Sequence, residues 1–243
     1  KIAVAIVTFW CIVTWPGFGG SDAVVMFNQT YQKDPELGKL MQNKDFRIAM
    51  SHAIDRSQIQ ESAFLGLGEP RTAVAAPWHP YFPGDQYAKK HTQYNPDAAN
   101  KALDQLGLTK RDGDGTRLLP SGKRVVLELS VVPAFAAWPD VAQLVARDWE
   151  KVGVKTVVQL RERALHFKMR DNNELMTEIW NEDTTGFPFT GNAKFDPRNS
   201  PILTLGPLYG RWAQTKGAEG VEPPAALTRG MENGAQAKTV GRA

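Results

Sequence analysis

The sequence predicts an α/β fold in which a mostly parallel β-sheet is flanked by helices. The chain has 243 residues, of which 42% are hydrophobic and 23% charged, the ordinary composition of a globular protein that can bury a core. Strand-like and helix-like segments alternate between Val125 and Trp180. Such alternation implies parallel strands joined by right-handed crossovers.

The N-terminal segment, residues 1–26, opens on an apolar run. Residues 2–13 read IAVAIVTFWCIV, too short to cross a membrane because a spanning helix needs about 20 apolar residues. The run fits the core of a signal peptide, which takes about 7–15 residues. It fits a buried strand of β-branched and aromatic residues equally well, and both interpretations stay open. Residues 23–27 have the pattern of a short buried strand.

Three helices are predicted before residue 110. From Asp45 onward, apolar residues recur at spacings of three and four, the pattern of one helical face. Ser57 and Gln60 have the spacing of a capping box that opens a second helix. The third helix has Asn95 as its N-cap and Gly107 as its stop.

Residues 69–94 form a long loop that is punctuated by prolines and carries several aromatic residues. Loops of this length are usually functional or disordered, and aromatic residues argue against disorder. We therefore expect Trp78, Tyr81 and Phe82 to lie near a ligand cleft, or on a surface that closes against another part of the protein.

The alternating region predicts five elements in order: a strand over 125–132, a helix from about 140 to 153, a strand over 154–160, a short helix over 164–170 and a strand over 175–180. Parallel strands place the loops 133–140, 161–163 and 181–186 at one edge of the sheet. Ligands bind at this carboxyl edge in open α/β sheets. Beyond Trp180 the chain is rich in prolines and looks loop-like.

Composition and motifs exclude several classes of function. The 29 basic and 26 acidic residues leave a net charge of +3 that is spread along the chain, so we expect no nucleic-acid partner. Cys11 is the only cysteine and the four histidines are scattered, so we expect no metal and no cofactor. Asp112 and Asp114 suggest a calcium loop, but Arg117 and Lys123 stand where glycine and glutamate are needed, and a β-turn is predicted instead.

Four segments resemble the family 5 solute-binding proteins of ABC transporters. Residues 43–56, NKDFRIAMSHAIDR, resemble the family's D-x-x-V-R-x-A-[IL]-x-x-A-I-D-R stretch. Residues 95–107 are similar to its Y-N-P-x-x-A-x-x-L-L-x-x-A-G helix, and residues 112–123 to its D-x-D-G hairpin that ends in G-K. Residues 148–154, DWEKVGV, resemble the turn that follows a later helix. The likeness covers residues 27–224 in consistent order.

The resemblance implies a periplasmic-binding-protein-like lobe over residues 27–224, mostly the second lobe of an incomplete two-lobe protein, with residues 225–243 as a truncated polar tail. It also implies a substrate-capture component of an ABC importer rather than an enzyme. The implied partners are a small-molecule or peptide ligand and the permease subunits in the membrane. The implied location is periplasmic or extracellular, with attachment to the membrane through the transporter.

In peptide binders of the family, an aspartate three residues after a tryptophan holds the amino terminus of the ligand. Asp183 stands at that distance from Trp180, and we therefore expect it to capture a cationic or polyhydroxylated group of the ligand. Trp180 and Trp138 are expected as apolar walls at the same strand edge. The following run, DTTGFPFTGNAKFDP, departs from the peptide-binder pattern and keeps oligosaccharides or opines open. A hydrolase whose nucleophile lies outside the chain and a purely structural lobe stay open as well.

Overall fold

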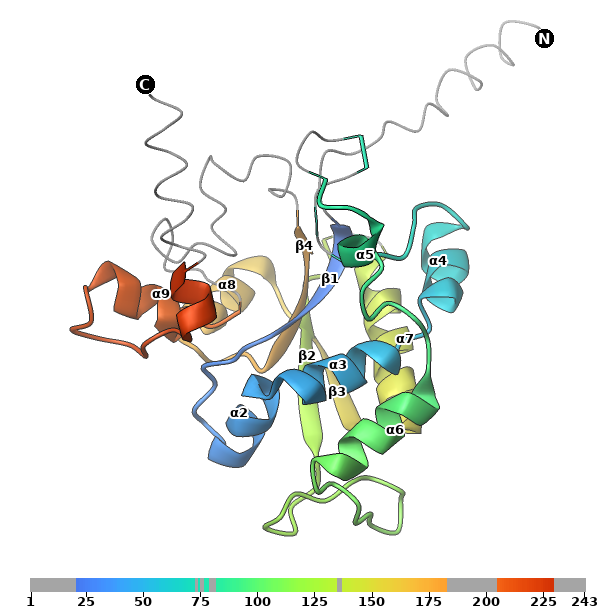
Figure 1. Cartoon of the computed structure of the whole chain (residues 1–243), viewed down its shortest axis with the longest axis horizontal. Helices are drawn as coiled ribbons and strands as arrows, with labels where there is room; N and C mark the ends of the chain where they lie inside the picture. Colours follow the sequence, from blue (N-terminus) through green and yellow to red (C-terminus); the bar gives the residue numbers. More distant parts are fainter. Residues whose placement is uncertain are drawn as a thin grey trace, which may run out of the picture.

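The computed structural model describes residues 21–72, 74, 77–78, 82–134, 137–182 and 205–229, which form a four-stranded sheet with helices on both faces (Figure 1). The strands are β1 (Ser21–Phe27), β2 (Val126–Val131), β3 (Lys155–Leu160) and β4 (Thr177–Glu182), in the spatial order β1-β4-β2-β3. β2 is parallel to both of its neighbours, β3 and β4, which confirms the predicted mostly parallel sheet. β1 is the exception, because it pairs antiparallel with β4 at the edge.

The helices connect and cover these strands. They are α2 (Pro35–Gln42), α3 (Lys44–His52), α4 (Arg56–Phe64), α5 (Asp85–Ala88), α6 (Pro96–Gln105), α7 (Trp138–Lys151), α8 (Arg163–Asp171) and α9 (Pro207–Gln214). Figure 1 shows α4 and α7 on one side of the sheet and α8 on the other. α7 and α8 are the two crossovers between parallel strands that the alternating pattern predicts.

The main core lies between the sheet and α7. Successive side chains of a strand point to opposite faces, so Leu127, Leu129 and Val131 of β2 all enter this core and are fully buried. Trp149 of α7 is also fully buried, stacks at a tilt on Phe27 with ring centroids 5.6 Å apart, and donates its Nε1 hydrogen to the carbonyl of Met50 at 3.0 Å. One tryptophan therefore joins α7, β1 and α3.

The three helices predicted before residue 110 are all formed, but one of their predicted caps is wrong. The Asn95 side chain accepts a hydrogen bond from the Ala98 amide at 2.9 Å, which confirms it as the N-cap of α6. The helix predicted from Asp45 is α3, which starts one residue earlier, at Lys44. The capping box at Ser57 is not formed, because the Asp55 carboxylate caps α4 by accepting from the Gln58 amide at 3.0 Å.

Three helices are not predicted by the sequence patterns: α5, which lies within the predicted loop 69–94, and α2 and α9, which both begin at a proline. α2 begins at Pro35 behind the capping side chain of Asp34, and α9 begins at Pro207. Proline is favoured in the first helical turn because its missing N–H is not needed there. The loop-like interpretation of the chain beyond Trp180 is therefore wrong for residues 207–214.

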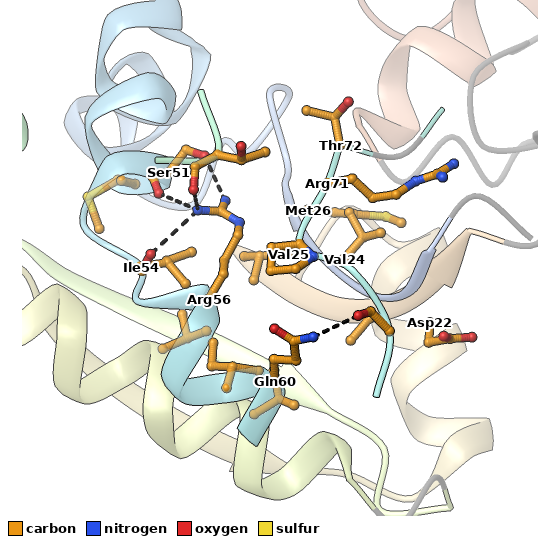
Figure 2. Close-up of a pocket in the computed structure, with 18 of the residues that line it drawn as sticks. Asp22, Val24, Val25, Met26, Ser51, Ile54, Arg56, Gln60, Arg71 and Thr72 are labelled. Carbon is orange, nitrogen blue, oxygen red and sulfur yellow. Dashed lines mark hydrogen bonds between the residues drawn. The ribbon is translucent and has the colours of Figure 1, made fainter. Parts of the chain in front are cut away.

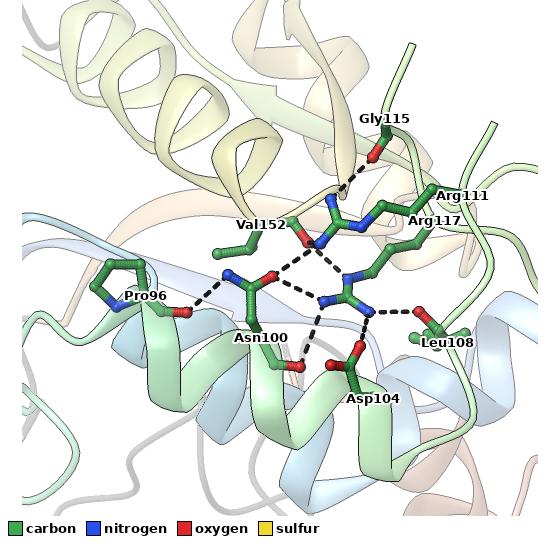
Figure 3. Close-up of polar contacts among 8 residues, drawn as sticks. All are labelled: Pro96, Asn100, Asp104, Leu108, Arg111, Gly115, Arg117 and Val152. Carbon is green, nitrogen blue, oxygen red and sulfur yellow. Dashed lines mark hydrogen bonds and ion pairs between the residues drawn. The ribbon is translucent and has the colours of Figure 1, made fainter. Parts of the chain in front are cut away.

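A buried arginine holds residues 111–124 against the helices (Figure 3); we call this segment the hairpin segment, because two isolated antiparallel bridges, Arg111–Arg117 and Leu118–Arg124, close two consecutive tight turns in it. Arg117 is 1% exposed and donates to the carbonyl of Val152 at 2.7 Å, to Asp104 at 2.6 Å and to the Asn100 side chain at 2.8 Å. The predicted β-turn is the first of these turns, where Asp112 accepts from the amides of Asp114 and Thr116 and its carboxylate pairs with Arg124.

Candidate functional site

The carboxyl edge of the sheet is the end at which β2, β3 and β4 finish and at which antiparallel β1 begins. Ser21 of β1 is in register with Glu182 of β4 at this edge. Trp138, the first residue of α7, donates its Nε1 hydrogen to the carbonyl of Asp22 at 2.9 Å. The indole thus ties the start of α7 to the start of β1 at the carboxyl edge.

Trp138 and Trp180 lie together at this edge, as their positions in the sequence indicate. Their ring centroids are 5.1 Å apart and their planes are inclined by 62°. Trp138 is 3% exposed and Trp180 is 7% exposed. The two indoles are therefore buried against each other at this edge. They do not form the two exposed apolar walls that the sequence predicts.

Helix α8 supplies a second layer of aromatic and charged side chains around Trp180. The His166 ring stacks on the indole with centroids 5.7 Å apart and an interplanar angle of 23°. Phe167 meets the same indole edge-on at 5.1 Å. The Arg163 guanidinium carbon lies 5.7 Å from the Trp180 ring and 5.4 Å from the Phe167 ring, both within range of a cation–π interaction.

A buried polar cluster lies directly behind Trp180. His166 is hydrogen-bonded through Nδ1 to the Ser130 hydroxyl at 3.0 Å and through Nε2 to a carboxylate oxygen of Glu178 at 2.6 Å. Ser130 and His166 are completely buried and Glu178 is 3% exposed. The Ser130 hydroxyl can donate to Nδ1 of a neutral ring or accept from a charged ring, and in both cases His166 donates to Glu178.

The order serine, histidine, carboxylate is that of a hydrolytic triad, but the cluster has no access to substrate. A nucleophilic hydroxyl must reach the carbonyl that it attacks, and Ser130, the last residue but one of β2, has no exposed surface. The cluster therefore orients side chains inside the lobe. Sequence reasoning missed it because its members are 36 and 12 residues apart. The sequence did contain one signal for this cluster: the polar residues Ser130 and Glu178 stand at inward-facing positions of buried strands.

The other predicted site residues are separated from this cluster or are not described. Trp78 is 57% exposed and Phe82 is half-buried, so neither belongs to the core. Asp183 and Tyr81 lie outside the described residues, as does the apolar run 2–13. Of the loop that carries Trp78, residues 70–72 face the start of β1 across a cavity.

That cavity, which we call the β1 pocket, has a volume of about 500 Å³ and is lined by residues of β1, α3, α4, α7 and 67–72 (Figure 2). Its lining is mainly apolar. Arg56 is the central polar group: its guanidinium donates to the carbonyl and the hydroxyl of Ser51, both at 2.8 Å, and to the carbonyl of Thr92 at 3.2 Å. Burial lowers the pKa of Arg56 because a low-dielectric surrounding disfavours the charged form.

Within the described ranges, no three His, Cys, Asp or Glu side chains are grouped so that they could hold one metal ion. In the same part of the chain, no helix is long and apolar enough to cross a membrane.

Comparison with curated proteins gives two relatives that match part of the chain. A probable ABC transporter-binding protein of Deinococcus radiodurans is 33% identical over 120 residues, which are 48% of this chain and 19% of the relative. A periplasmic alpha-galactoside-binding protein of Rhizobium meliloti is 30% identical over 146 residues, which are 55% of this chain and 19% of the relative. The chain therefore aligns with only about a fifth of either protein.

Among solved structures, an oligopeptide-binding protein, OppA, superposes on 91% of the chain with a TM-score of 0.80 and 30% identity. The chain accounts for 36% of that structure, so it corresponds to part of a larger protein. The sequence model of the bacterial extracellular solute-binding proteins of family 5, middle portion, matches residues 18–200. This match agrees with a binding protein and not with an enzyme. The α/β fold of the lobe agrees with these comparisons, and so does the order of the segments from residues 43–56 to residues 148–154. The chain therefore belongs to the family 5 bacterial extracellular solute-binding proteins.

Proposed function

We propose that this chain is the larger part of one lobe of a solute-capture protein that delivers its ligand to the permease subunits of an ABC importer. The observation that carries the proposal is the carboxyl edge, where Trp138, Trp180 and the α8 residues gather in a chain of this family. Ligands of open α/β sheets bind outside the carboxyl ends of the strands. In this proposal the solute lies between that edge and a second lobe contributed by polypeptide outside residues 1–243.

The first candidate ligand is a small peptide, with Asp183 capturing its amino group. Asp183 directly follows Glu182, the residue at which β4 ends on the carboxyl edge. The 30% identical solved structure is an oligopeptide-binding protein. The exposed Trp78 would then cover the bound ligand from the loop side, together with Tyr81 and Phe82.

The second candidate ligand is an oligosaccharide, and two observations favour it. One curated relative is an alpha-galactoside-binding protein. The chain also carries 7 tryptophans, and aromatic faces bind the apolar faces of sugar rings. An opine, which carries both an amine and a carboxylate, is compatible with Asp183 for the same reason as a peptide.

Calorimetric titration distinguishes these ligands. A polypeptide that extends these 243 residues to both lobes would be titrated with mixed oligopeptides, opines and oligosaccharides. For an amine-bearing ligand, Asp183→Ala should weaken binding by about 2–5 kcal/mol, the usual cost of removing one partner of a buried charge pair. The free energy of unfolding of the Asp183→Ala variant should change much less than its free energy of binding.

Glu61→Ala is the matched control, because it removes one negative charge from an exposed position on α4. It should leave affinity unchanged. If only neutral sugars bind, and Asp183→Ala binds them as tightly as the parent protein does, amine capture is wrong and Trp78 and Trp180 become the residues to substitute.

A further inference from the structure

The buried polar cluster behind Trp180 fixes the His166 ring from both of its nitrogens. Ser130 and Glu178 are in register on the neighbouring strands β2 and β4, so their side chains leave the sheet on the same face. His166 of α8 reaches this face and is bonded to the Ser130 hydroxyl at 3.0 Å and to the Glu178 carboxylate at 2.6 Å. Because hydrogen bonds are directional, two of them at different atoms of one ring define both its position and its plane.

His166 presents the face of this fixed ring to Trp180. Trp180 stands two residues after Glu178 on β4, so both side chains lie on the same face of the sheet. The imidazole and indole planes are nearly parallel, at 23°. Phe167, the next residue of α8, meets both rings edge-on, with its centroid 5.9 Å from that of His166 and 5.1 Å from that of Trp180. The indole therefore packs on a ring whose plane is set by hydrogen bonds.

Stability alone does not explain why a histidine and a carboxylate are buried here. Glu178 is 3% exposed, and in the described part of the chain no lysine or arginine forms an ion pair with it. Burying a carboxylate costs free energy, and replacing a buried charged pair with apolar residues of similar volume is often neutral or stabilising. Apolar side chains would fill the same space, but they would not define the plane of a ring. Orientation therefore explains the cluster better than stability does.

Trp180 carries this orientation to the carboxyl edge of the sheet. It lies two residues before the end of β4 and packs on Trp138, whose indole is bonded to the start of β1. On the α8 side, the guanidinium of Arg163 lies over the Trp180 ring, and the Arg163 side chain is exposed. A tilt of the Trp180 indole would therefore displace both an aromatic and a charged neighbour at the edge proposed for the ligand.

We propose that His166 is a positioning residue for solute capture. Held by hydrogen bonds at both ring nitrogens, it fixes the indole plane of Trp180. The indole in turn fixes Trp138 and Arg163 at the edge where the solute binds. His166 is completely buried and acts only through these neighbours. The assignment rests on the proposed function, because it takes the carboxyl edge as the place where the solute binds.

Two substitutions at Glu178 separate the hydrogen bond from the charge and the volume. Glu178→Gln keeps an acceptor oxygen for His166, whereas Glu178→Leu has a similar size and no acceptor. In a polypeptide extended to both lobes, Glu178→Leu should weaken solute binding about tenfold and Glu178→Gln less than about twofold, since residues remote from a ligand modulate its affinity on this scale. Calorimetric titration with oligopeptides, opines and oligosaccharides measures both variants.

A triple variant separates positioning from stability. Ser130→Ala, His166→Phe and Glu178→Leu together remove the polar cluster without leaving one of its side-chain polar atoms unpaired. The free energy of unfolding in urea should equal or exceed that of the parent protein. Solute binding should nevertheless be about tenfold weaker. If the cluster only filled space, affinity would instead stay at the parent value whenever stability does.

The orientation of Trp180 is measured without solute, so this result does not depend on the proposed function. In the extended polypeptide labelled with 5-fluorotryptophan, the Trp180 fluorine resonance is identified by its loss in Trp180→Phe. It should be one narrow line in the parent and in Glu178→Gln, and it should broaden or split in Glu178→Leu and in the triple variant. His52→Phe is the matched control and should change neither the line nor the affinity, because His52 ends α3 and bonds to the carbonyl of Gln93, outside the cluster.

Three results would overturn the assignment. A Trp180 line that is unchanged in Glu178→Leu and in the triple variant means that His166 does not fix the indole. A changed line with unchanged affinity means that the indole does not position the solute. Equal losses of affinity in Glu178→Leu and Glu178→Gln mean that the charge acts and the hydrogen bond does not. If the parent binds none of the solutes, the proposed function is wrong, and the Trp180 line alone then decides whether His166 fixes the indole.

Discussion

Asp34 combines helix capping with an ion pair to another segment. Its side chain accepts hydrogen bonds from the Glu36 and Leu37 amides at 3.0 and 3.2 Å, and it lies 3.6 Å from Lys123 on the hairpin segment. The hydrogen bond from the Leu37 amide is the main cause that lowers the pKa of Asp34, and the Lys123 charge adds to it. The carboxylate therefore stabilises the fold in its charged form.

The sign of the pH dependence follows from that lowered pKa. Asp34 contributes stability above its unfolded pKa and loses it as the pH falls through its lower folded pKa. Asp34→Asn keeps the cap but cannot titrate. We expect the variant to be less stable than the parent at pH 7, with the difference shrinking at about pH 3, when both are measured by urea unfolding. A difference that is constant with pH would show that the Asp34 charge does not contribute.

The residues at the carboxyl edge show how much of the candidate site could be predicted from the sequence alone. Trp138 and Trp180 could be placed together because each stands at the end of a predicted strand, or just past it. The His166 cluster could not be predicted, because the pairing of Ser130 with Glu178 depends on β4 lying next to β2 in the sheet. Strand order is a tertiary property that hydrophobic periodicity does not contain.

At the scale of elements, Arg117 joins three pieces of the chain that are distant in sequence. Its guanidinium reaches α6 through Asp104 and Asn100, the connection after α6 through the carbonyl of Leu108, and the end of α7 through the carbonyl of Val152. Gly153 allows this approach. It has a φ of +85°, and a Cβ at this position would lie 2.8 Å from Cγ of Arg117.

Arg117→Met should therefore be among the most destabilising substitutions on the hairpin segment. It leaves the buried carbonyl oxygens of Leu108 and Val152 without this donor, and each buried acceptor left unsatisfied costs about 1–3 kcal/mol, whereas the Asp104 carboxylate is 53% exposed and returns to water. Arg124→Met is the control on the same hairpin segment, since the Arg124 side chain is 44% exposed and a surface pair contributes about 0–1 kcal/mol. The free energy of unfolding in urea measures both. If both variants lose the same free energy of unfolding, Arg117 does not hold these three pieces of the chain together.

Local signals predicted the elements that carry strong periodicity and caps, such as α3, α6 and α7. They failed at Ser57, where Asp55 competes as a cap, and at Pro35 and Pro207, where a helix starts on a residue that also marks loops. The parallel pairing of β2 with β3 was predictable, because one helix separates them. The antiparallel position of β1 was not, since its partner strand β4 lies far along the chain, beyond both other strands, and no local signal spans such a distance.

At the scale of the whole molecule, one continuous core joins the sheet to α3, α6 and α7. Trp149 lies in this core and touches elements from both halves of the described chain. We therefore expect the lobe to unfold as a single cooperative unit.

Trp149→Ala should lower the free energy of unfolding by about 3–5 kcal/mol, the usual cost of truncating a buried tryptophan. Trp78→Ala provides a matched comparison, because Trp78 is 57% exposed and exposed substitutions usually change stability by about 0.5 kcal/mol or less. Far-ultraviolet circular dichroism and fluorescence, followed through the same denaturant series, should shift together in Trp149→Ala. Separate transitions for the two signals would show that the lobe contains independent units.

The antiparallel contact between β1 and β4 also sets how the lobe responds to force. β1 starts and β4 ends at the same edge, with Ser21 opposite Glu182. Tension between the polypeptide before Ser21 and the polypeptide after Glu182 therefore loads the hydrogen bonds of this pair one at a time, from that edge inward, as in opening a zipper. β2 and β3 are parallel and joined through α7, so tension at opposite ends of that pair loads its bonds simultaneously in shear. The edge at which β1 starts and β4 ends is thus the mechanically soft end of the sheet, and the β2–β3 side is the stiff one.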